Sequence, residues 1–135
     1  QRVAQICAQF DVPSIAADRW RLEDFQSLAS DHGITVPPLV PFGQGFKDMG
    51  PAVEAVESEL ANGRLQHGMH PILTWCVSNA KAVPDPTGAR KADKRKSSGR
   101  IDGAVALIMA MGLASKTPFV PVVPSVYASR GLRFL

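Results

Sequence analysis

Two aspartates in this sequence stand where a carboxylate could hold a metal ion, and Asp18 is the first of them. The apolar run Ser14-Ile15-Ala16-Ala17 predicts a short buried strand that ends at Asp18, with a helix after it. Because ligands of open α/β sheets gather at the carboxyl ends of strands, Asp18 is a candidate metal ligand. An aspartate before a helix is also a common N-cap, and the residue alone favours this second interpretation.

Asp102 is the second candidate, because it stands at the start of a strongly apolar helix. Residues 104–111 contain no polar side chain, and a helix that is apolar on all sides is predicted to be buried. A carboxylate in its first turn, beside the small Gly103 and Ala106, would need a cation or several hydrogen-bond donors. An equally good interpretation is an acid that complements the helix dipole and pairs with Arg100.

Together the two aspartates suggest metal-assisted hydrolysis. Mg²⁺ and Mn²⁺ prefer oxygen ligands, and a pair of such ions can activate water and stabilise the leaving oxygen of a phosphodiester. We therefore expect Asp18 and Asp102 to lie close enough to share or flank one ion. The other nearby acids are predicted to be solvated; they are Glu23, Asp24 and Asp48.

A basic segment precedes Asp102. The chain carries a formal net charge of +3, and residues 90–100 hold six Lys and Arg side chains against the single acid Asp93. Such a cluster can neutralise phosphates and make nucleic-acid binding salt-dependent, although a solvated loop of a basic protein would have the same composition. The candidate DNA-binding residues are Lys91, Lys94, Arg95, Lys96 and Arg100.

The elements that must position these residues alternate between strands and helices, which predicts an α/β fold in one compact domain spanning residues 1–135. We expect helices over residues 3–10, 19–32, 51–62, 71–77 and 100–114, strands over 14–17 and 34–42, a basic hairpin around 84–88, and an extended tail after Pro118. Pro51 is predicted to start its helix, and Ser97 or Ser98 to cap the last one. The longest apolar stretch, residues 104–114, is too short to span a bilayer, so no membrane partner is expected.

Four motifs in order carry a family resemblance: Asp18-Arg19-Trp20, Phe42-Gly43-Gln44-Gly45-Phe46, His67-Gly68-Met69-His70-Pro71-Ile72-Leu73, and the block from Lys94 to Gly103 that contains Arg100-Ile101-Asp102-Gly103. They look like the nuclease domain of large terminase subunits of the HK97-like group of tailed bacteriophages. Ser125-Val126-Tyr127 and Gly131-Leu132 are similar to the end of that domain. Each motif alone is weak, but the ordered set is specific and covers nearly the whole chain.

The resemblance implies an RNase H-like fold, in which helices flank a mixed sheet. It also implies that the protein is a hydrolase, namely a divalent-metal-dependent endodeoxyribonuclease that cuts concatemeric viral DNA during genome packaging. By position in the motifs, Asp18 and Asp102 match the family's catalytic metal ligands, for two Mg²⁺ or Mn²⁺ ions. The implied partners are double-stranded DNA, the portal and the small terminase subunit, and the implied location is the host cell cytoplasm.

The sequence departs from the family pattern in three ways. Ala17 stands where the family usually has an aromatic residue, and His70 stands where it usually has Asn. The strand that carries a further metal-binding aspartate has no counterpart here, and the ATPase domain with its Walker A motif is absent. We therefore expect the first strands of the sheet to be missing, and an upstream segment, a partner chain or self-association to cover the exposed edge. The alternative function is a non-catalytic DNA-gripping or assembly module of the packaging machinery, and metal binding would separate the two.

Overall fold

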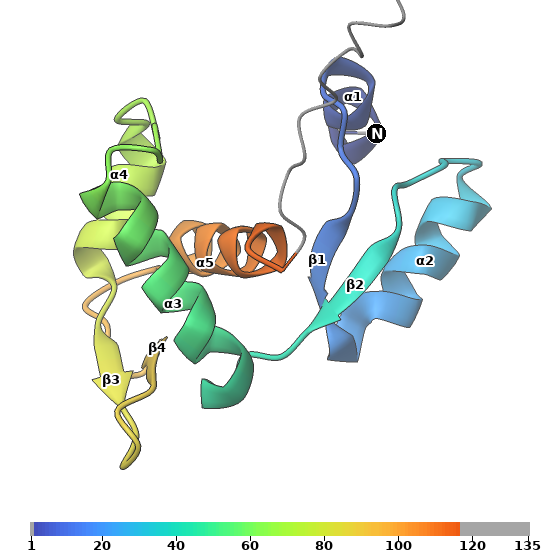
Figure 1. The fold of residues 1–135 in the computed structure, drawn as a ribbon. Helices are drawn as coiled ribbons and strands as arrows, with labels where there is room; N and C mark the ends of the chain where they lie inside the picture. The colour runs from blue at the N-terminus through green and yellow to red at the C-terminus, as the bar shows by residue number, and fades with distance from the viewer. Residues whose placement is uncertain (1, 117–135) are drawn as a thin grey trace, which may run out of the picture.

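The computed structural model describes residues 2–116 of the chain. Helices and strands follow one another in the order α1 (Arg2–Gln9), β1 (Ile15–Asp18), the 3-10 helix η1 (Arg19–Arg21), α2 (Leu22–Asp31), β2 (Leu39–Phe42), α3 (Phe46–Ala61), α4 (Pro71–Asn79), β3 (Ala82–Pro84), β4 (Arg90–Ala92) and α5 (Asp102–Ala114). Figure 1 shows α5 between the α3–α4 side of the molecule and β1, with α2 beside β2 on the opposite side. None of the helices within residues 2–116 is long and apolar enough to cross a membrane.

The described strands form two pairs. β1 and β2 are parallel, with Ile15 opposite Leu39 and Asp18 opposite Phe42. β3 and β4 form the predicted antiparallel hairpin, in which Ala82 faces Ala92. The expected strand over residues 34–42 is reduced to its last four residues, because proline cannot donate to a ladder and Pro37 and Pro38 precede Leu39. Within residues 2–116, β1 and β2 each pair with one neighbour only.

The hydrophobic core lies where α3, α4 and α5 meet the end of β2. Its buried members are Phe42, Met49, Ala52, Cys76, Ile101, Ala104, Val105 and Met109. Gly112 lets α5 approach α3 closely, since a Cβ atom there would lie 2.5 Å from the Cβ of Ala52 and 2.8 Å from Cζ of Phe42. These contacts place the end of α5 against both α3 and the carboxyl end of β2.

Helix α3 starts earlier than predicted. It begins at Phe46, and Pro51 lies inside the helix rather than at its first position. The turn before Pro51 is held by tertiary packing, because Met49 is 1% exposed and its backbone N–H donates to the carbonyl of Gly45 at 2.9 Å. The prediction that the helix starts at Pro51 was therefore wrong, because burial of the preceding turn decides where this helix begins.

Helix α5 also differs from its prediction. It starts at Asp102, and no side chain caps it. The Ser97 hydroxyl donates to the carbonyl of Asp93 at 2.7 Å, and the Ser98 hydroxyl donates to the Asn79 side chain at 3.3 Å. Both serines therefore fasten the loop before α5 instead of capping the helix. The predicted extended tail after Pro118 lies outside the described residues.

Candidate functional site

Asp18 ends β1, and both of its carboxylate oxygens accept hydrogen bonds. Oδ1 accepts from the backbone N–H of Trp20 at 3.2 Å, so Asp18 is the N-cap of η1, as one of the two interpretations predicted. Oδ2 accepts from Nε2 of Gln44 at 3.0 Å. The parallel register brings these groups together, because Phe42 lies opposite Asp18 and Gln44 follows two residues later. The half-buried carboxylate is therefore held in position from two sides.

Asp48 joins this end of the sheet, which the sequence did not predict. Its side chain is only 28% exposed, and Oδ2 lies 3.4 Å from the guanidinium of Arg19. A side chain at the buried Gly43 would collide with that carboxylate, so the glycine makes room for it. Asp48 is therefore partly buried and ion-paired rather than fully solvated as predicted, because the loop after β2 brings the first turn of α3 to Arg19, which directly follows β1. Glu23 and Asp24 are exposed, as predicted.

Asp102 is the first residue of α5, and its side chain is 65% exposed. The expected buried carboxylate is wrong, because in the described chain the first turn of α5 packs through Ile101 and Ala104 and turns Asp102 outward. Its Oδ1 accepts a hydrogen bond from Nζ of Lys94 at 2.9 Å. This bond is the main reason that the pKa of Asp102 lies below its ordinary value, and the nearby charges of Lys94 and Arg100 lower that pKa further. The predicted ion pair with Arg100 is thus replaced by one with Lys94.

Asp18 and Asp102 have separate surroundings. Gly112 approaches Phe42, the register partner of Asp18, whereas Asp102 lies ten residues earlier on α5. That separation corresponds to a rise of about 15 Å along a helix. Within residues 2–116, no group of three or more His, Cys, Asp or Glu side chains could hold a metal ion. An ion shared between the two aspartates therefore stays a prediction.

The cations of the basic segment have distinct contacts. Arg90 forms a bidentate pair with the carboxylate of Glu57 on α3. Lys91 lies over the ring of Phe46, with Nζ 4.7 Å from its centroid. Lys94 binds Asp102, as described above. The remaining predicted DNA-binding side chains are exposed and have no acidic partner in the described part of the chain; they are Arg95, Lys96 and Arg100.

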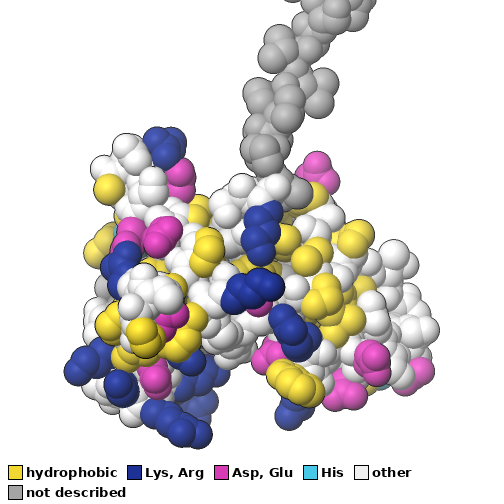
Figure 2. Space-filling model, turned by 60° about the horizontal axis from the view of Figure 1, so that its bottom comes forward, with side chains coloured by type: hydrophobic (Ala, Val, Ile, Leu, Met, Phe, Trp, Pro, Cys, Tyr) yellow, Lys and Arg dark blue, Asp and Glu magenta, His cyan; other side chains and the backbone are white. Residues whose placement is uncertain are grey.

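The loop that carries these exposed cations is well anchored. The Asp93 carboxylate accepts hydrogen bonds from the backbone N–H groups of Arg95 at 2.8 Å and Lys96 at 3.3 Å, which lowers the pKa of Asp93. The backbone N–H of Asp93 in turn donates to the carbonyl of Lys81. In Figure 2 several dark-blue Lys and Arg side chains gather at the lower left of the molecule, and others lie over the centre of the face and at the upper left. The lone acid of the segment therefore shapes the loop, and the charges of Lys91 and Lys96 lower its pKa further.

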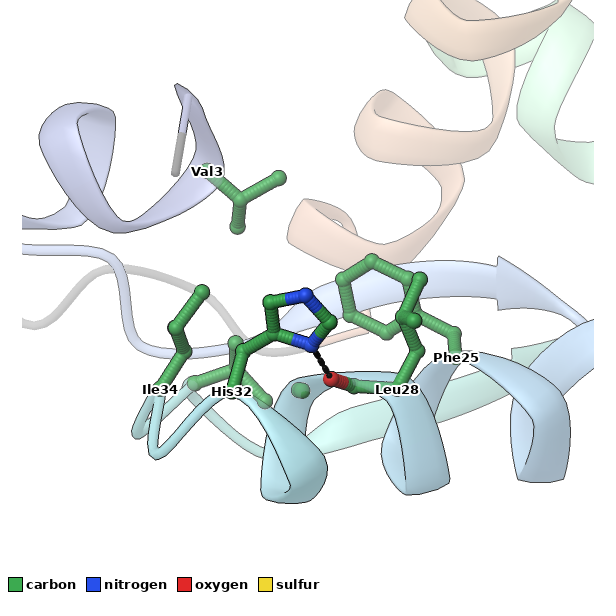
Figure 3. A pocket seen from close by; sticks show the side chains of 7 residues that line it. Val3, Phe25, Leu28, His32 and Ile34 are labelled. Carbon is green, nitrogen blue, oxygen red and sulfur yellow. Dashed lines mark hydrogen bonds between the residues drawn. The ribbon is translucent and has the colours of Figure 1, made fainter.

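A pocket elsewhere in the molecule has a different character. It lies between α1 and α2, and Figure 3 shows Val3, Phe25, Leu28 and Ile34 around it. Its polar group is His32, whose Nδ1 lies 3.0 Å from the carbonyl oxygen of Leu28. With no acidic side chain in its lining, the pocket offers hydrophobic contact rather than hydrolytic chemistry.

The fold and the site define a class: an α/β domain that presents carboxylates together with a cationic loop. Residues 1–117 match the family model of the terminase large subunit, endonuclease domain, and this chain belongs to that family. The chain is 54% identical over 113 residues to the terminase large subunit of Enterobacteria phage HK97, in an alignment that covers 84% of this chain and 22% of the relative. It is 30% identical over 117 residues to Protein YmfN of Escherichia coli strain K12, covering 71% of this chain and 26% of that protein.

A solved structure shows the same arrangement. The crystal structure of the HK97 bacteriophage large terminase superposes with a TM-score of 0.80 at 54% sequence identity, over 84% of this chain and 23% of that one. The resemblance to the HK97-like terminases is therefore confirmed in both sequence and structure. The chain spans about a quarter or less of the length of the relatives it matches.

Proposed function

We propose that this domain is a divalent-metal-dependent DNA endonuclease of RNase H-like fold, which cuts concatemeric viral DNA during genome packaging in the host cell cytoplasm. The observation that carries the proposal is the 2.9 Å contact between Lys94 and Asp102, because it joins the cationic loop to a carboxylate at the start of α5. A nuclease needs both groups at one place: cations to hold the phosphate backbone and a carboxylate to hold the ion that acts on it.

The donor chemistry of the chain fits Mg²⁺ or Mn²⁺, since Asp18 and Asp102 offer carboxylate oxygens. Asp18 and Asp102 would hold the ions, which when bound supply a Lewis acid and an activated water. Two carboxylates are a partial set, and within residues 2–116 no group of three or more His, Cys, Asp or Glu side chains could hold a metal ion. We infer that the remaining ligand comes from another part of the full-length protein, because the alignment with the HK97 relative covers only 22% of that relative.

The chain's own residues have defined roles in this proposal. Gln44 and the N–H of Trp20 orient the Asp18 carboxylate through their hydrogen bonds. The side chains of Arg95, Lys96 and Arg100 bind phosphates, and Lys91 extends this surface from the ring of Phe46. Phosphate contacts position DNA without reading its sequence, which suits a packaging machine that must accept any DNA.

The proposed partners are double-stranded DNA, the portal and the small terminase subunit. The unpaired edges of β1 and β2 within residues 2–116 support contact with a further strand, from an upstream segment, a partner chain or a second copy. The alternative function, a non-catalytic DNA-gripping or assembly module, is supported by the exposed cationic loop together with the absence of a three-carboxylate group in the described residues.

Plasmid relaxation by the full-length protein separates these functions. We expect Mn²⁺- or Mg²⁺-dependent nicking that EDTA abolishes and that falls at least a hundredfold in Asp18→Asn and in Asp102→Asn, on the order of the loss when a charge-stabilising catalytic group is removed. DNA binding that persists without any metal-dependent nicking would favour the gripping module. Nicking that survives Asp102→Asn would overturn the assignment of this carboxylate.

A further inference from the structure

An exposed tryptophan lies on α4, the helix that packs beside α5 (Figure 1). Trp75 is 51% exposed, and within residues 2–116 no cation lies over its ring. Another face of α4 packs against α5, where an added Cβ at Gly103 would lie 3.2 Å from Sγ of Cys76 and 3.8 Å from Cδ1 of Leu73. Trp75 is therefore presented outward by a helix that its own packing holds in place.

The side of α4 that carries Trp75 borders the cationic loop. Asn79 follows Trp75 by four residues, and residues four apart are neighbours on the surface of a helix. The Asn79 side chain donates to the carbonyl of Arg100 at 3.5 Å and accepts from the Ser98 hydroxyl at 3.3 Å. The loop that leads into α5 therefore passes along the Trp75 side of α4.

The surroundings of this side are strongly cationic. Lys81 follows α4 and is fastened to the loop, because its N–H donates to the Ser97 hydroxyl at 3.1 Å and its carbonyl accepts from the N–H of Asp93 at 3.0 Å. The side chains of Lys81 and Arg100 are exposed and have no acidic partner in the described part of the chain. Residues 71–101 contain seven Lys and Arg side chains against two Asp, so an anionic ligand suits this surface.

We propose that this surface binds unpaired DNA, with one base stacked on the indole of Trp75 and the adjoining phosphates bound by Arg100 and Lys81. The inference rests on the proposed function and names a second form of its DNA ligand. The bases of a duplex are stacked on one another, so only an unpaired base can offer its face to an aromatic side chain. Every base has such a face, and cations beside an aromatic side chain are the combination by which proteins bind single strands of any sequence.

The cations also distinguish DNA from an apolar protein partner. An apolar surface docked on Trp75 would leave Lys81 and Arg100 without counter-charges at its border, whereas a DNA strand supplies a phosphate at every nucleotide. The same surface without the tryptophan would bind single strands and duplexes through phosphates alone. Trp75 therefore adds the preference for an unpaired base.

The test uses the full-length protein in EDTA, so that bound DNA is not cut, and measures anisotropy of a labelled oligothymidine strand and of a duplex of the same length. We expect Trp75→Ala to lose about five- to tenfold in affinity for the strand, at the lower end of what one stacked base contributes, and less than about twofold for the duplex. Trp75→Phe keeps an aromatic face and should retain most of the affinity. Ile72→Ala is the matched control, because Ile72 is 65% exposed, lies three residues from Trp75 on α4 and has no aromatic ring.

Photocrosslinking of the wild-type protein locates the stacked base. The strand carries 5-iododeoxyuridine in place of thymidine, a base that reacts on irradiation with an aromatic side chain on which it is stacked. We expect a crosslinked peptide that contains Trp75, identified by mass spectrometry. If circular dichroism shows that Trp75→Ala is unfolded, Trp75→Leu keeps apolar bulk on the helix and takes its place in the binding measurements.

The inference stands only if the loss of affinity is selective for the strand and Trp75 is crosslinked. It is overturned if no crosslink forms at Trp75, if the variant without the indole binds the strand as tightly as wild type, or if the duplex or Ile72→Ala shows the same loss. Because the binding needs no metal ion, failure of metal-dependent nicking would leave this result intact. Failure of the stacking would in turn leave plasmid nicking, and with it the proposed function, unchanged.

Discussion

The exposed cations of the loop allow a quantitative prediction of how DNA affinity depends on salt concentration. Arg95 and Lys96 are exposed and have no acidic partner in the described residues, so both are available to phosphates. Each neutralised phosphate contributes about 0.9 to the slope of log affinity against log salt concentration, so Arg95→Gln/Lys96→Gln should flatten the slope by about 1.8. Between 50 and 200 mM salt, the wild type should lose about tenfold more affinity than the double variant.

The measurement is fluorescence anisotropy of unrelated duplexes across this salt range. Arg64→Gln is the control, since its guanidinium is held by Glu59 at 2.6 and 2.8 Å and lies outside the basic segment. We expect this control to keep the wild-type slope. An unchanged slope in the double variant would refute the assignment of phosphate contacts to this loop. A loss of affinity for one duplex only would show that the loop reads bases instead.

Three further predictions concern packing, pH and completeness. Gly112→Ala should lower the melting temperature measured by circular dichroism, because its new Cβ would lie 2.5 Å from that of Ala52. Overpacking costs about 1–3 kcal/mol, whereas the higher helix propensity of alanine contributes about 1 kcal/mol in the opposite direction. Gly103→Ala is the control and should change stability less, because its new Cβ would meet the Cys76 thiol at 3.2 Å. In NMR titration, the carboxylate of Asp102 should show a pKa below its ordinary value, and this pKa should rise in Lys94→Gln. The Lys94 contact stabilises the fold at pH values above the ordinary pKa of the carboxyl group, and this stabilisation is lost as the pH falls through the lowered pKa of the folded state. An unchanged pKa in the variant would contradict the contact. Residues 1–135 alone should nick plasmid poorly in Mn²⁺ compared with the full-length protein, and equal nicking would mean that Asp48 or another acid of this chain completes the site.

The local signals of the sequence were sufficient for several elements. The apolar run before Asp18 is β1, the residues around Pro71 form α4, and the turn at residues 85–88 joins β3 to β4. In that turn the Asp85 carboxylate accepts from the N–H groups of Thr87 and Ala89, which is the short-range chemistry that favours aspartate in turns. Gly33 adopts a φ of +61° after α2, as expected of a residue that ends a helix.

The starts of α3 and α5 depend on contacts that no local pattern contains. Met49 is buried against other elements, and this burial keeps a turn of helix in front of Pro51. Ser97 and Ser98 bond residues of the preceding segment, namely Lys81, Asn79 and Asp93. A serine before a helix predicts a cap only if its hydroxyl has no better partner, and here those partners are brought close by the hairpin.

The site was predicted only in part for the same reason. Asp18 follows from the end of a strand, but the parallel pairing of β1 with β2 is what brings Gln44 to Asp18 and Asp48 to the neighbouring Arg19. The signal that could have found them is the loop Gly43-Gln44-Gly45, because a polar residue between two glycines directly after a strand has the freedom to turn toward the neighbouring strand end. The prediction that Asp102 is buried was wrong. An apolar helix indicates that other elements must pack against it, but it does not indicate which of its turns they cover.

The contacts of the basic segment within the protein reduce the number of its cations that are available to bind phosphates. Arg90 is paired with Glu57 and fastens the hairpin to α3, beside Gly50, where an added Cβ would lie 3.1 Å from that of Ala89. Lys91 covers the ring of Phe46, and Lys94 neutralises Asp102. Half of the cations in the segment therefore already have partners, and the number of phosphate contacts expected of the domain without metal is smaller than the charge suggests.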